Sequence, residues 1–308
     1  MFHGSRLGAC AGVVAAGFVV LADGAPRAQP RETQIFRSGV DLVQVTATVR
    51  DGDGRLVGDL VRDDFEILED GRPQPITQFD RGRVPVSLGV VLDVSESMYG
   101  RRMEDARFAL RRFLVDLLEP TDEAFLVVFN HDPRLEEPWT AGPHRLQGRL
   151  DDVRPYGATA IYDAMDMALP LFASRSHARA ALVLISDGSD TASDATPTDV
   201  RRAIRQSDAF VYAIGIDATE HRPINDSVNP RVLREITDES GGYTEIIHDS
   251  PDLAPATERI AEELNHQYTL GYTPTRAPDG RYHRIRVRVG RGDYDVRARR
   301  GYVATTNP

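Results

Sequence analysis

The sequence predicts an α/β fold: a doubly wound, mainly parallel sheet with helices on both faces, inserted in or flanked by a small β-sandwich-like domain. Three observations lead to this prediction. Residues 86–92 form a nearly continuous apolar run, which is typical of a strand buried on both faces. Further apolar runs then alternate with stretches of helical periodicity. Short β-rich segments separated by turns stand on either side of this region, before residue 84 and after residue 266.

Length and composition restrict the function. The 308 residues, 41% of them hydrophobic, are enough for roughly two globular domains. The net charge of -10 argues against a general affinity for nucleic acid, whose phosphates require a positive surface. All 37 basic residues are arginine. Without lysine, the chain cannot form the usual phosphate-binding loop, a Schiff base or a kinase-type catalytic lysine.

Residues 1–30 read as an export signal. A basic start is followed by the uncharged run LGACAGVVAAGFVVLA and then by small residues. The run is short for a membrane span, so we expect a signal peptide, with an uncleaved N-terminal anchor as the alternative. Cys10, the single cysteine, belongs to this segment. The protein is therefore expected to be exported, as a periplasmic, cell-surface or secreted protein, with membrane contact only through such an anchor.

An N-terminal β segment is predicted over residues 31–83. It contains three short β-rich stretches, at 40–49, 65–68 and 76–79. The sequence Asp51-Gly-Asp-Gly54 is a strong turn signal between the first two. It resembles the start of a calcium-binding loop, but Arg62 stands where such a loop needs its bidentate glutamate, so a hairpin turn is the preferred interpretation.

The central region, residues 84–266, carries the alternating pattern. Its apolar strand candidates after residues 86–92 are 124–129, 180–185 and 209–214. Apolar residues recur at helical spacing in the stretches between and after them, which are 103–118, 160–173, 197–206, 230–238 and 251–267.

A C-terminal β segment is predicted over residues 267–308, with strands at 268–272, 284–289 and 294–298. Apolar residues and arginines alternate in the middle strand. The arginines form either an anion-binding stripe or, as we prefer, a solvated strand face. Neither flanking segment is large enough to bury a core alone, so we expect residues 31–83 and 267–308 to pack together around the inserted central domain.

Oxygen-bearing side chains gather where the predicted strands end. Asp93, Ser95 and Ser97 directly follow the first buried strand, and alternate residues there can project together. Thr159 precedes a helix, and Asp187 follows another buried strand. In open α/β sheets, ligands bind beyond the carboxyl ends of the strands, so we expect these groups to meet at one edge. Hydroxyl and carboxylate oxygens suit Mg²⁺, which prefers six oxygen ligands.

At these residues the sequence resembles the von Willebrand factor A-type (VWFA) domain, whose metal-ion-dependent adhesion site (MIDAS) uses a D-x-S-x-S motif, a distant threonine and a distant aspartate. The flanks, including Asp63-Asp-Phe-Glu-Ile-Leu-Glu-Asp-Gly71 and Arg299-Arg-Gly-Tyr302, resemble bacterial exported "VWFA-related" proteins. The resemblance implies that Ser95, Ser97 and Thr159 contribute hydroxyls to the ion. Asp93 and Asp187 would bind it directly or through water.

The function implied is a metal-dependent protein-binding or adhesion module, not an enzyme. A divalent ion held mainly by neutral hydroxyls stays electron-poor and accepts a carboxylate from a partner's Asp or Glu. Mg²⁺ is the expected ion, with Mn²⁺ or Ca²⁺ as alternatives. In some members of the family, occupancy moves the last helix, which here is the stretch 251–267.

Other interpretations of these residues compete with this one. Residues 93–97 could be only a capped turn, since Asp and Ser favour turns and helix caps. The ion could be purely structural, locking a fold or an assembly. A metal-dependent phosphoryl-transfer enzyme is a remote rival, because Ser95 stands where the common phosphatase motif has a second aspartate. Asp190 and Asp194 are assigned to a solvated loop and left out of the site.

Overall fold

The structure is a computed structural model that describes residues 42–114, 118–142, 145–217, 229–248, 252–290 and 292–305. Residues Val40–Pro308 form one compact unit. The predicted signal or anchor, with Cys10, lies outside the described residues. In the part of the chain that is described, we find no helix with the length and apolar character that a membrane span requires.

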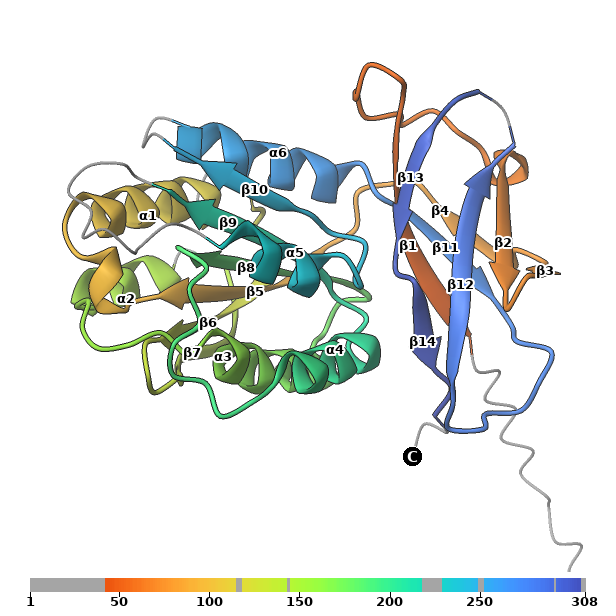
Figure 1. Cartoon of the computed structure of the whole chain (residues 1–308). Helices are drawn as coiled ribbons and strands as arrows, with labels where there is room; N and C mark the ends of the chain where they lie inside the picture. Colours follow the sequence, from red (N-terminus) through yellow and green to blue (C-terminus); the bar gives the residue numbers. More distant parts are fainter. Residues whose placement is uncertain are drawn as a thin grey trace, which may run out of the picture. The chain divides into compact units, whose positions relative to one another are not determined.

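Within the described residues, the central region forms a six-stranded sheet in the order β10-β9-β8-β5-β6-β7 (Figure 1). Its parallel strands are β5 (Val86–Asp93), β6 (Glu123–Phe129), β8 (Arg179–Ser186), β9 (Phe210–Ile216) and β10 (Thr244–Ile247). Every residue of β5 is buried, because the strand lies between β8 and β6 and both faces of the sheet are covered. The predicted doubly wound fold is therefore confirmed.

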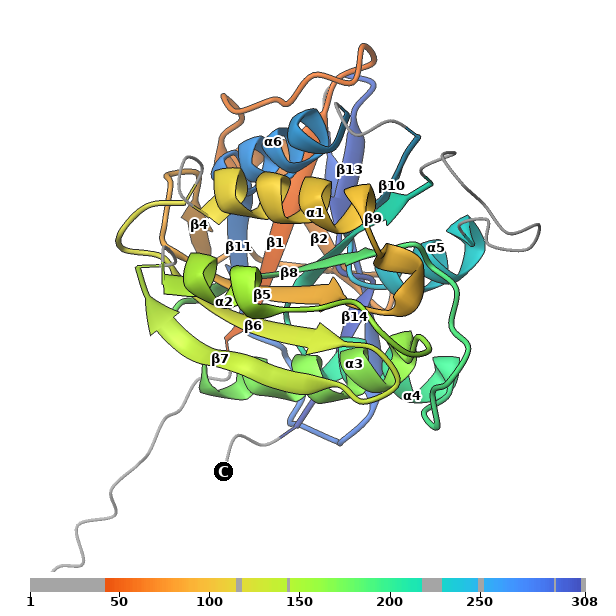
Figure 2. The ribbon, with the colours of Figure 1, turned by 90° about the vertical axis from the view of Figure 1, so that its left-hand side faces the viewer.

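Helices cover both faces of this sheet, as Figure 2 shows. One face packs against α1 (Arg101–Arg112), α2 (Leu146–Asp152) and α6 (Leu253–Asn265) through a core that includes Leu110 and Ile260. The other face packs against α3 (Ile161–Ala168), α4 (Pro197–Gln206) and α5 (Pro230–Thr237), with Met165 and Leu233 in its core. The two separate cores are what an α/β sheet with buried faces requires.

The structure differs from the sequence prediction at several elements. An edge strand, β7 (Arg134–Ala141), pairs antiparallel with β6 and was not predicted, because its polar residues and Pro138 hide the β pattern. The short elements α2 and β10 were also missed. The helix predicted over 160–173 is two elements: Pro170 cannot donate a backbone hydrogen bond, and residues Leu169–Ser174 form a 3₁₀ helix instead.

The described flanks form two four-stranded sheets, β13-β1-β11-β4 and β14-β12-β2-β3. Strands from before and after the central region pair directly in both. Thus β1 (Val43–Arg50) pairs antiparallel with β11 (Tyr268–Tyr272), and β2 (Phe65–Glu69) with β12 (Tyr282–Val289). The remaining strands are short, namely β3 (Arg72–Gln74), β4 (Gln78–Asp80), β13 (Asp295–Ala298) and β14 (Gly301–Val303).

These two sheets share a core that includes Val45, Ile67 and Leu270. On β12 the apolar side chains are buried in this core while Arg284, Arg286 and Arg288 are exposed. The arginines thus form a solvated strand face, as preferred from the sequence. The Asp51 carboxylate accepts hydrogen bonds from the amides of Asp53 and Arg55, which makes residues 51–55 the expected turn after β1.

A buried carboxylate joins α6 to one β-sheet of the flanks, the sheet that contains β1 and β13. Glu263, near the end of α6, has no exposed area. It accepts hydrogen bonds from Arg50 on β1, at 2.9 Å, and from Arg297 on β13. The Thr48 hydroxyl and the Tyr212 hydroxyl also donate to it, at 3.3 and 3.0 Å. Because two guanidinium groups offset its charge, this carboxylate is suited to holding the fold together.

Candidate metal site at the carboxyl edge of the central sheet

Asp93 is the last residue of β5 and is completely buried. Its Oδ1 accepts a hydrogen bond from the amide of Ser95, at 2.8 Å, so the chain turns back over its own carboxylate. Its Oδ2 accepts a hydrogen bond from the hydroxyl of Ser186, at 2.6 Å, at the end of the neighbouring strand β8. Both oxygens are therefore fixed by neutral donors.

The two serines of the D-x-S-x-S sequence lie together. A 3₁₀ turn over Glu96–Met98 follows Ser95, and Met98 is buried beneath it. The turn brings the hydroxyl oxygens of Ser95 and Ser97 to 2.9 Å from each other. Ser95 is buried, whereas Ser97 is partly exposed. Two oxygens thus converge at the end of β5, with an approach from solvent on the side of Ser97.

The loop that carries Thr159 is joined to the first loop through its backbone. The amide of Glu96 donates to the carbonyl of Gly157, and the amide of Tyr156 donates to the carbonyl of Val94, both at 2.9 Å. Gly157 has a φ of 78°, and a Cβ there would lie 2.5 Å from Nδ1 of His131, so glycine is required. Thr159 is 5% exposed. This loop and the D-x-S-x-S loop form one backbone-bonded unit.

Asp187 follows β8 and is also buried. Arg102, on the first turn of α1, lies 3.7 Å from the Asp187 carboxylate and donates to the carbonyl of Ser97, at 2.8 Å. Arg102 thus links the third loop to the first. It was not predicted as part of the site, because no sequence signal distinguishes it from the other arginines of its helix.

Residues 189–195 support the loops of the site through hydrogen bonds. The Asp190 carboxylate accepts hydrogen bonds from the amide of Ile161, at 2.8 Å, and from the hydroxyl of Ser193, at 2.6 Å. It therefore caps the N-terminus of α3, which begins two residues after Thr159. The amide of Thr191 also donates to the Thr159 carbonyl, at 2.8 Å. Leaving Asp190 out of the ligand set is consistent with these bonds, but Asp190 is half-buried and structural, not solvated.

Electrostatics distinguish this site from an ordinary capped turn. The pKa of Asp93 is raised to about 7: burial raises it most and the negative charge of Asp187 adds to this, while hydrogen bonds from Ser186 and Ser95 lower it. A fold gains nothing from keeping two like charges close together away from water. A divalent cation would offset both charges, and the five side chains offer only oxygen atoms, which suits Mg²⁺, Mn²⁺ or Ca²⁺.

A second cluster of ionisable groups lies between β2 and β12. Among the described residues, Glu69, Asp70 and His283 are the group of His, Cys, Asp and Glu side chains close enough together to hold a metal ion. Both ring nitrogens of His283 are already engaged, with Asp70 and with Asp279, each at 2.9 Å. Arg276 also pairs with Glu69, at 3.3 Å. In the structure, this cluster is therefore an ion-pair network whose carboxylates are offset by His283 and Arg276.

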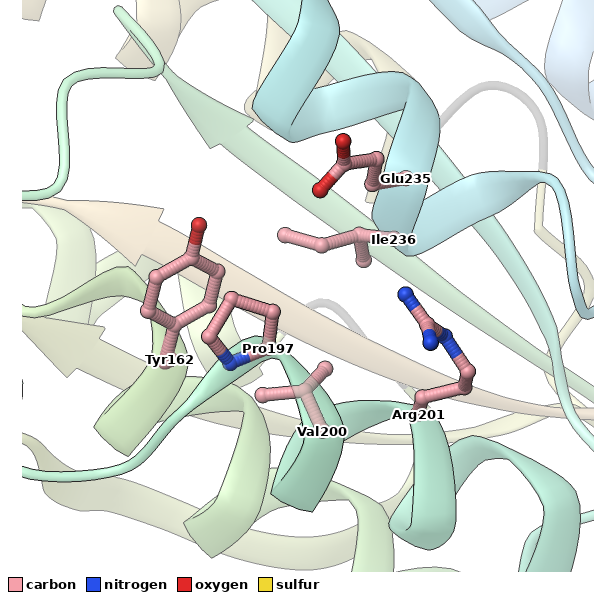
Figure 3. Close-up of a pocket in the computed structure, with 6 residues that line it drawn as sticks. All are labelled: Tyr162, Pro197, Val200, Arg201, Glu235 and Ile236. Carbon is pink, nitrogen blue, oxygen red and sulfur yellow. The ribbon is translucent and has the colours of Figure 1, made fainter.

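A small pocket opens between α3, α4 and α5. Figure 3 shows its lining, in which Tyr162, Val200 and Ile236 face the space and Arg201 and Glu235 stand at its sides. The space inside is about 10 Å³, roughly enough for one water molecule. It is too small to hold an organic ligand.

Comparison with known families identifies the central domain. Residues 88–189 match the family model described as the von Willebrand factor type A domain, and this span includes Asp93, Ser95, Ser97, Thr159 and Asp187. This part of the chain is a von Willebrand factor type A domain. The chain therefore carries a module of the adhesion and protein-interaction class.

Relatives support the domain assignment and are much longer proteins. Inter-alpha-trypsin inhibitor heavy chain H4 of Homo sapiens is 25% identical over 198 residues, which is 59% of this chain and 20% of that protein. Heavy chain H2 of Mus musculus is 24% identical over 200 residues, again 59% and 20%. The chain thus spans about a fifth of the length of the curated relatives that it matches.

Solved structures share the fold at low sequence identity. A von Willebrand factor type A protein from Catenulispora acidiphila superposes with a TM-score of 0.51 at 15% identity, covering 85% of this chain and 73% of that one. Proximal thread matrix protein 1 from the mussel byssus, in a structure described as having a zinc-occupied MIDAS motif, gives a TM-score of 0.52 at 17% identity, covering 62% and 48%.

Proposed function

We propose that this protein is an exported binding module that holds a divalent cation at Asp93, Ser95, Ser97, Thr159 and Asp187 and binds a partner through it. The observation that carries the proposal is the buried Asp93 carboxylate, whose pKa is raised by burial and by Asp187 at the edge of a parallel sheet. Hydroxyl groups converge beside it. Arg102, 3.7 Å from the Asp187 carboxylate, offsets part of this negative charge, and a bound cation would offset the rest.

Each side chain has a distinct part in this proposal. The hydroxyls of Ser95, Ser97 and Thr159 contribute neutral oxygens, while Asp93 and Asp187 bind the ion directly or through water. Ser186 orients Asp93 through its 2.6 Å hydrogen bond. When bound, the cation would supply one open coordination position for an Asp or Glu carboxylate of a partner protein or peptide. Mg²⁺ is the preferred ion, with Mn²⁺ and Ca²⁺ as alternatives that the same oxygens would accept.

The proposed activity is binding and not catalysis. The second candidate function is structural: the ion would only stabilise the fold or an assembly. The near-complete burial of Asp93, Ser95 and Asp187 favours this alternative. The partial exposure of Ser97 favours an accessible site. The two functions differ in how the bound ion responds to added carboxylate ligands. Only an accessible ion can bind them.

Calorimetric titration with Mg²⁺ tests the ligand set. Asp93→Ala, and the double change Ser95→Ala with Ser97→Ala, should abolish the binding heat while circular dichroism shows a folded protein. Asp53→Ala is the matched control: Asp53 is an exposed aspartate in a turn between strands, and the variant should bind as the parent does. Undiminished heats in the Asp93→Ala variant would refute the assignment.

Titration with a short acidic peptide separates binding from a structural role. The capped peptide acetyl-Gly-Asp-Gly-amide should bind in Mg²⁺, lose binding in EDTA, and lose it when asparagine replaces its aspartate. If Mg²⁺ binds but no carboxylate peptide at millimolar concentration perturbs the protein's NMR spectrum, the structural alternative holds.

A further inference from the structure

Two exposed tyrosines stand on the loops of the candidate metal site. Tyr99 is 78% exposed and Tyr156 is 51% exposed, although large aromatic side chains of a soluble domain are usually well covered. Tyr99 comes two residues after Ser97. Tyr156 comes three residues before Thr159, on the loop that is hydrogen-bonded to the D-x-S-x-S loop at Val94 and Glu96. Both tyrosines therefore belong to the loops that carry the site residues.

The backbone under both tyrosines is well fixed. The amide of Tyr99 donates to the Glu96 carbonyl, at 3.0 Å, and the preceding Met98 is buried. The ring of Tyr156 meets the ring of His131 edge to face, with centroids 5.9 Å apart. His131 comes two residues after the end of β6, and its position is what excludes a side chain at Gly157. These aromatic groups are thus presented from firm loops.

We propose that Tyr99 and Tyr156 form an aromatic rim that selects the partner: an acidic peptide segment in which bulky apolar residues flank the aspartate or glutamate. This inference rests on the proposed function, since the carboxylate is what the metal site would bind. A rigid tyrosine buries much apolar area at a low cost in conformational entropy, which makes it a common anchor in interfaces.

The charges around the rim are consistent with an acidic segment. Arg101 and Arg154 are two residues in sequence from Tyr99 and from Tyr156, and both arginines are exposed. Glu96 is exposed on the same loop. An anionic partner is therefore favoured by the site and its arginines, and Glu96 should disfavour a second acidic residue beside the first.

Three capped peptides test the rim: acetyl-Phe-Asp-Phe-amide, acetyl-Gly-Asp-Gly-amide and acetyl-Phe-Asn-Phe-amide. In Mg²⁺, NMR titration should give the first peptide at least tenfold higher affinity than the second, with the third too weak to measure. Binding of the first peptide should shift the ring resonances of Tyr99 and Tyr156. In the double variant Tyr99→Ser with Tyr156→Ser, the tenfold preference should fall to about twofold or less.

The control is Phe108→Ser, which removes an exposed aromatic ring, 62% exposed, from the middle of α1 and should keep the preference. The tyrosine variants should retain the parent's Mg²⁺ affinity and melting temperature. Equal affinity of the parent for the Phe and Gly peptides would overturn the rim and leave the proposed function standing.

Other outcomes would assign the tyrosines differently. If neither aspartate peptide binds in Mg²⁺, the proposed function itself fails. If the parent self-associates in Mg²⁺ and the double variant does not, the rim is a contact with a second copy of this chain, and the acidic-peptide proposal is overturned. Analytical ultracentrifugation of both proteins, with and without EDTA, gives this result.

Discussion

Asp93 and Glu263 are both completely buried carboxylates, and their surroundings are opposite. Glu263, on α6, accepts hydrogen bonds from two guanidinium groups, those of Arg50 and Arg297. Asp93, at the end of β5, accepts hydrogen bonds from a neutral amide and a neutral hydroxyl, and the charge of Asp187 lies close enough to raise its pKa. Burial is the same in the two places, and only the compensation of charge differs.

The difference indicates what each carboxylate does. A buried charge that the chain itself offsets is an internal link, and here it joins α6 to β1 and β13. A buried charge held beside a like charge costs stability until something from outside offsets it. Such costs are typical of functional sites, where binding compensates for them. The same type of side chain is thus structural in one place and a candidate ligand in the other.

The largest expected effect is the loss of Glu263. Glu263→Ala would leave Arg50 and Arg297 without their partner and the Tyr212 hydroxyl without its acceptor. We expect the free energy of unfolding to fall by about 3 to 5 kcal/mol, as for other broken buried ion pairs. Urea unfolding measures this, and Glu262→Ala, an exposed neighbour on the same helix, should change it little. Equal effects of the two substitutions would show that the buried ion pairs do not hold α6.

Asp93→Asn should raise the free energy of unfolding of the metal-free protein, whereas Glu263→Ala lowers it. The folded pKa of about 7 lies above the ordinary value of 3.8, so ionising Asp93 opposes folding: stability falls as pH rises from about 4 to about 7 and stays low above that. The full difference between the folded and unfolded pKa values corresponds to roughly 4 kcal/mol of stability. Relaxation of the site should reduce this loss of stability to about half.

Chemical unfolding in EDTA at pH 5 and pH 8 measures this effect. The asparagine variant should be more stable than the parent by about 2 kcal/mol at pH 8 and by less than about 1 kcal/mol at pH 5. Adding Mg²⁺ at pH 8 should stabilise the parent and leave the variant unchanged. A variant that is less stable than the parent at pH 8 would mean that the Asp93 charge is already compensated within the chain.

Much of the fold could be predicted because its strongest signals are local. The central strand predicted over 86–92 corresponds to β5, where every residue is buried and the apolar run is nearly continuous. The α/β class followed from the alternation of such runs with helical periodicity, and it is confirmed. The edge strand β7 could not be recognised, because an edge strand tolerates Pro138 and exposed polar residues that a buried strand excludes.

The candidate site was predictable in part, for the same physical reason. Asp93, Ser95 and Ser97 are close in sequence, so a single turn brings their oxygens together. Arg102 and the orienting role of Ser186 depend on side-chain directions that the tertiary structure sets. The exposure of Tyr99 and Tyr156 likewise has no sequence signature, since a tyrosine beside an apolar stretch usually packs into the core.

Ser186→Ala sharpens the comparison by loosening Asp93 without changing its charge. The Ser186 hydroxyl donates to Asp93, at 2.6 Å, and accepts from the amide of Gly188, at 3.0 Å. Removing a group that orients a ligand typically costs tenfold or more in metal affinity. We therefore expect calorimetry to give a Mg²⁺ dissociation constant about tenfold larger than that of the parent. Ser174→Ala, an exposed serine whose hydroxyl donates to a backbone carbonyl, is the control. An unchanged affinity would remove Ser186 from the site.

The smallest expected effect concerns the Asp70 carboxylate, whose charge is offset by the titratable side chain of His283. The hydrogen bond to Asp70, then that to Asp279, raises the pKa of His283 above its ordinary 6.5, so this stabilisation is complete below about pH 6.5 and is lost as pH rises through the higher folded value. The hydrogen bond from His283 lowers the pKa of Asp70 below 3.8, so that contribution is present above about pH 3.8 and is lost on further acidification.

The cluster should therefore stabilise the fold most between about pH 4 and 6.5, a range in which the metal-free Asp93 site progressively destabilises it. Urea unfolding between pH 6 and 9 should show a shallower loss of stability in His283→Gln than in the parent. The matched control is His248→Gln, an exposed histidine 3.1 Å from Asp217, which should keep the slope of the parent because exposed pairs contribute little. A slope that both variants share with the parent would mean that the charge of His283 does not stabilise the fold, and the contrast with Asp93 would then rest on Glu263 alone.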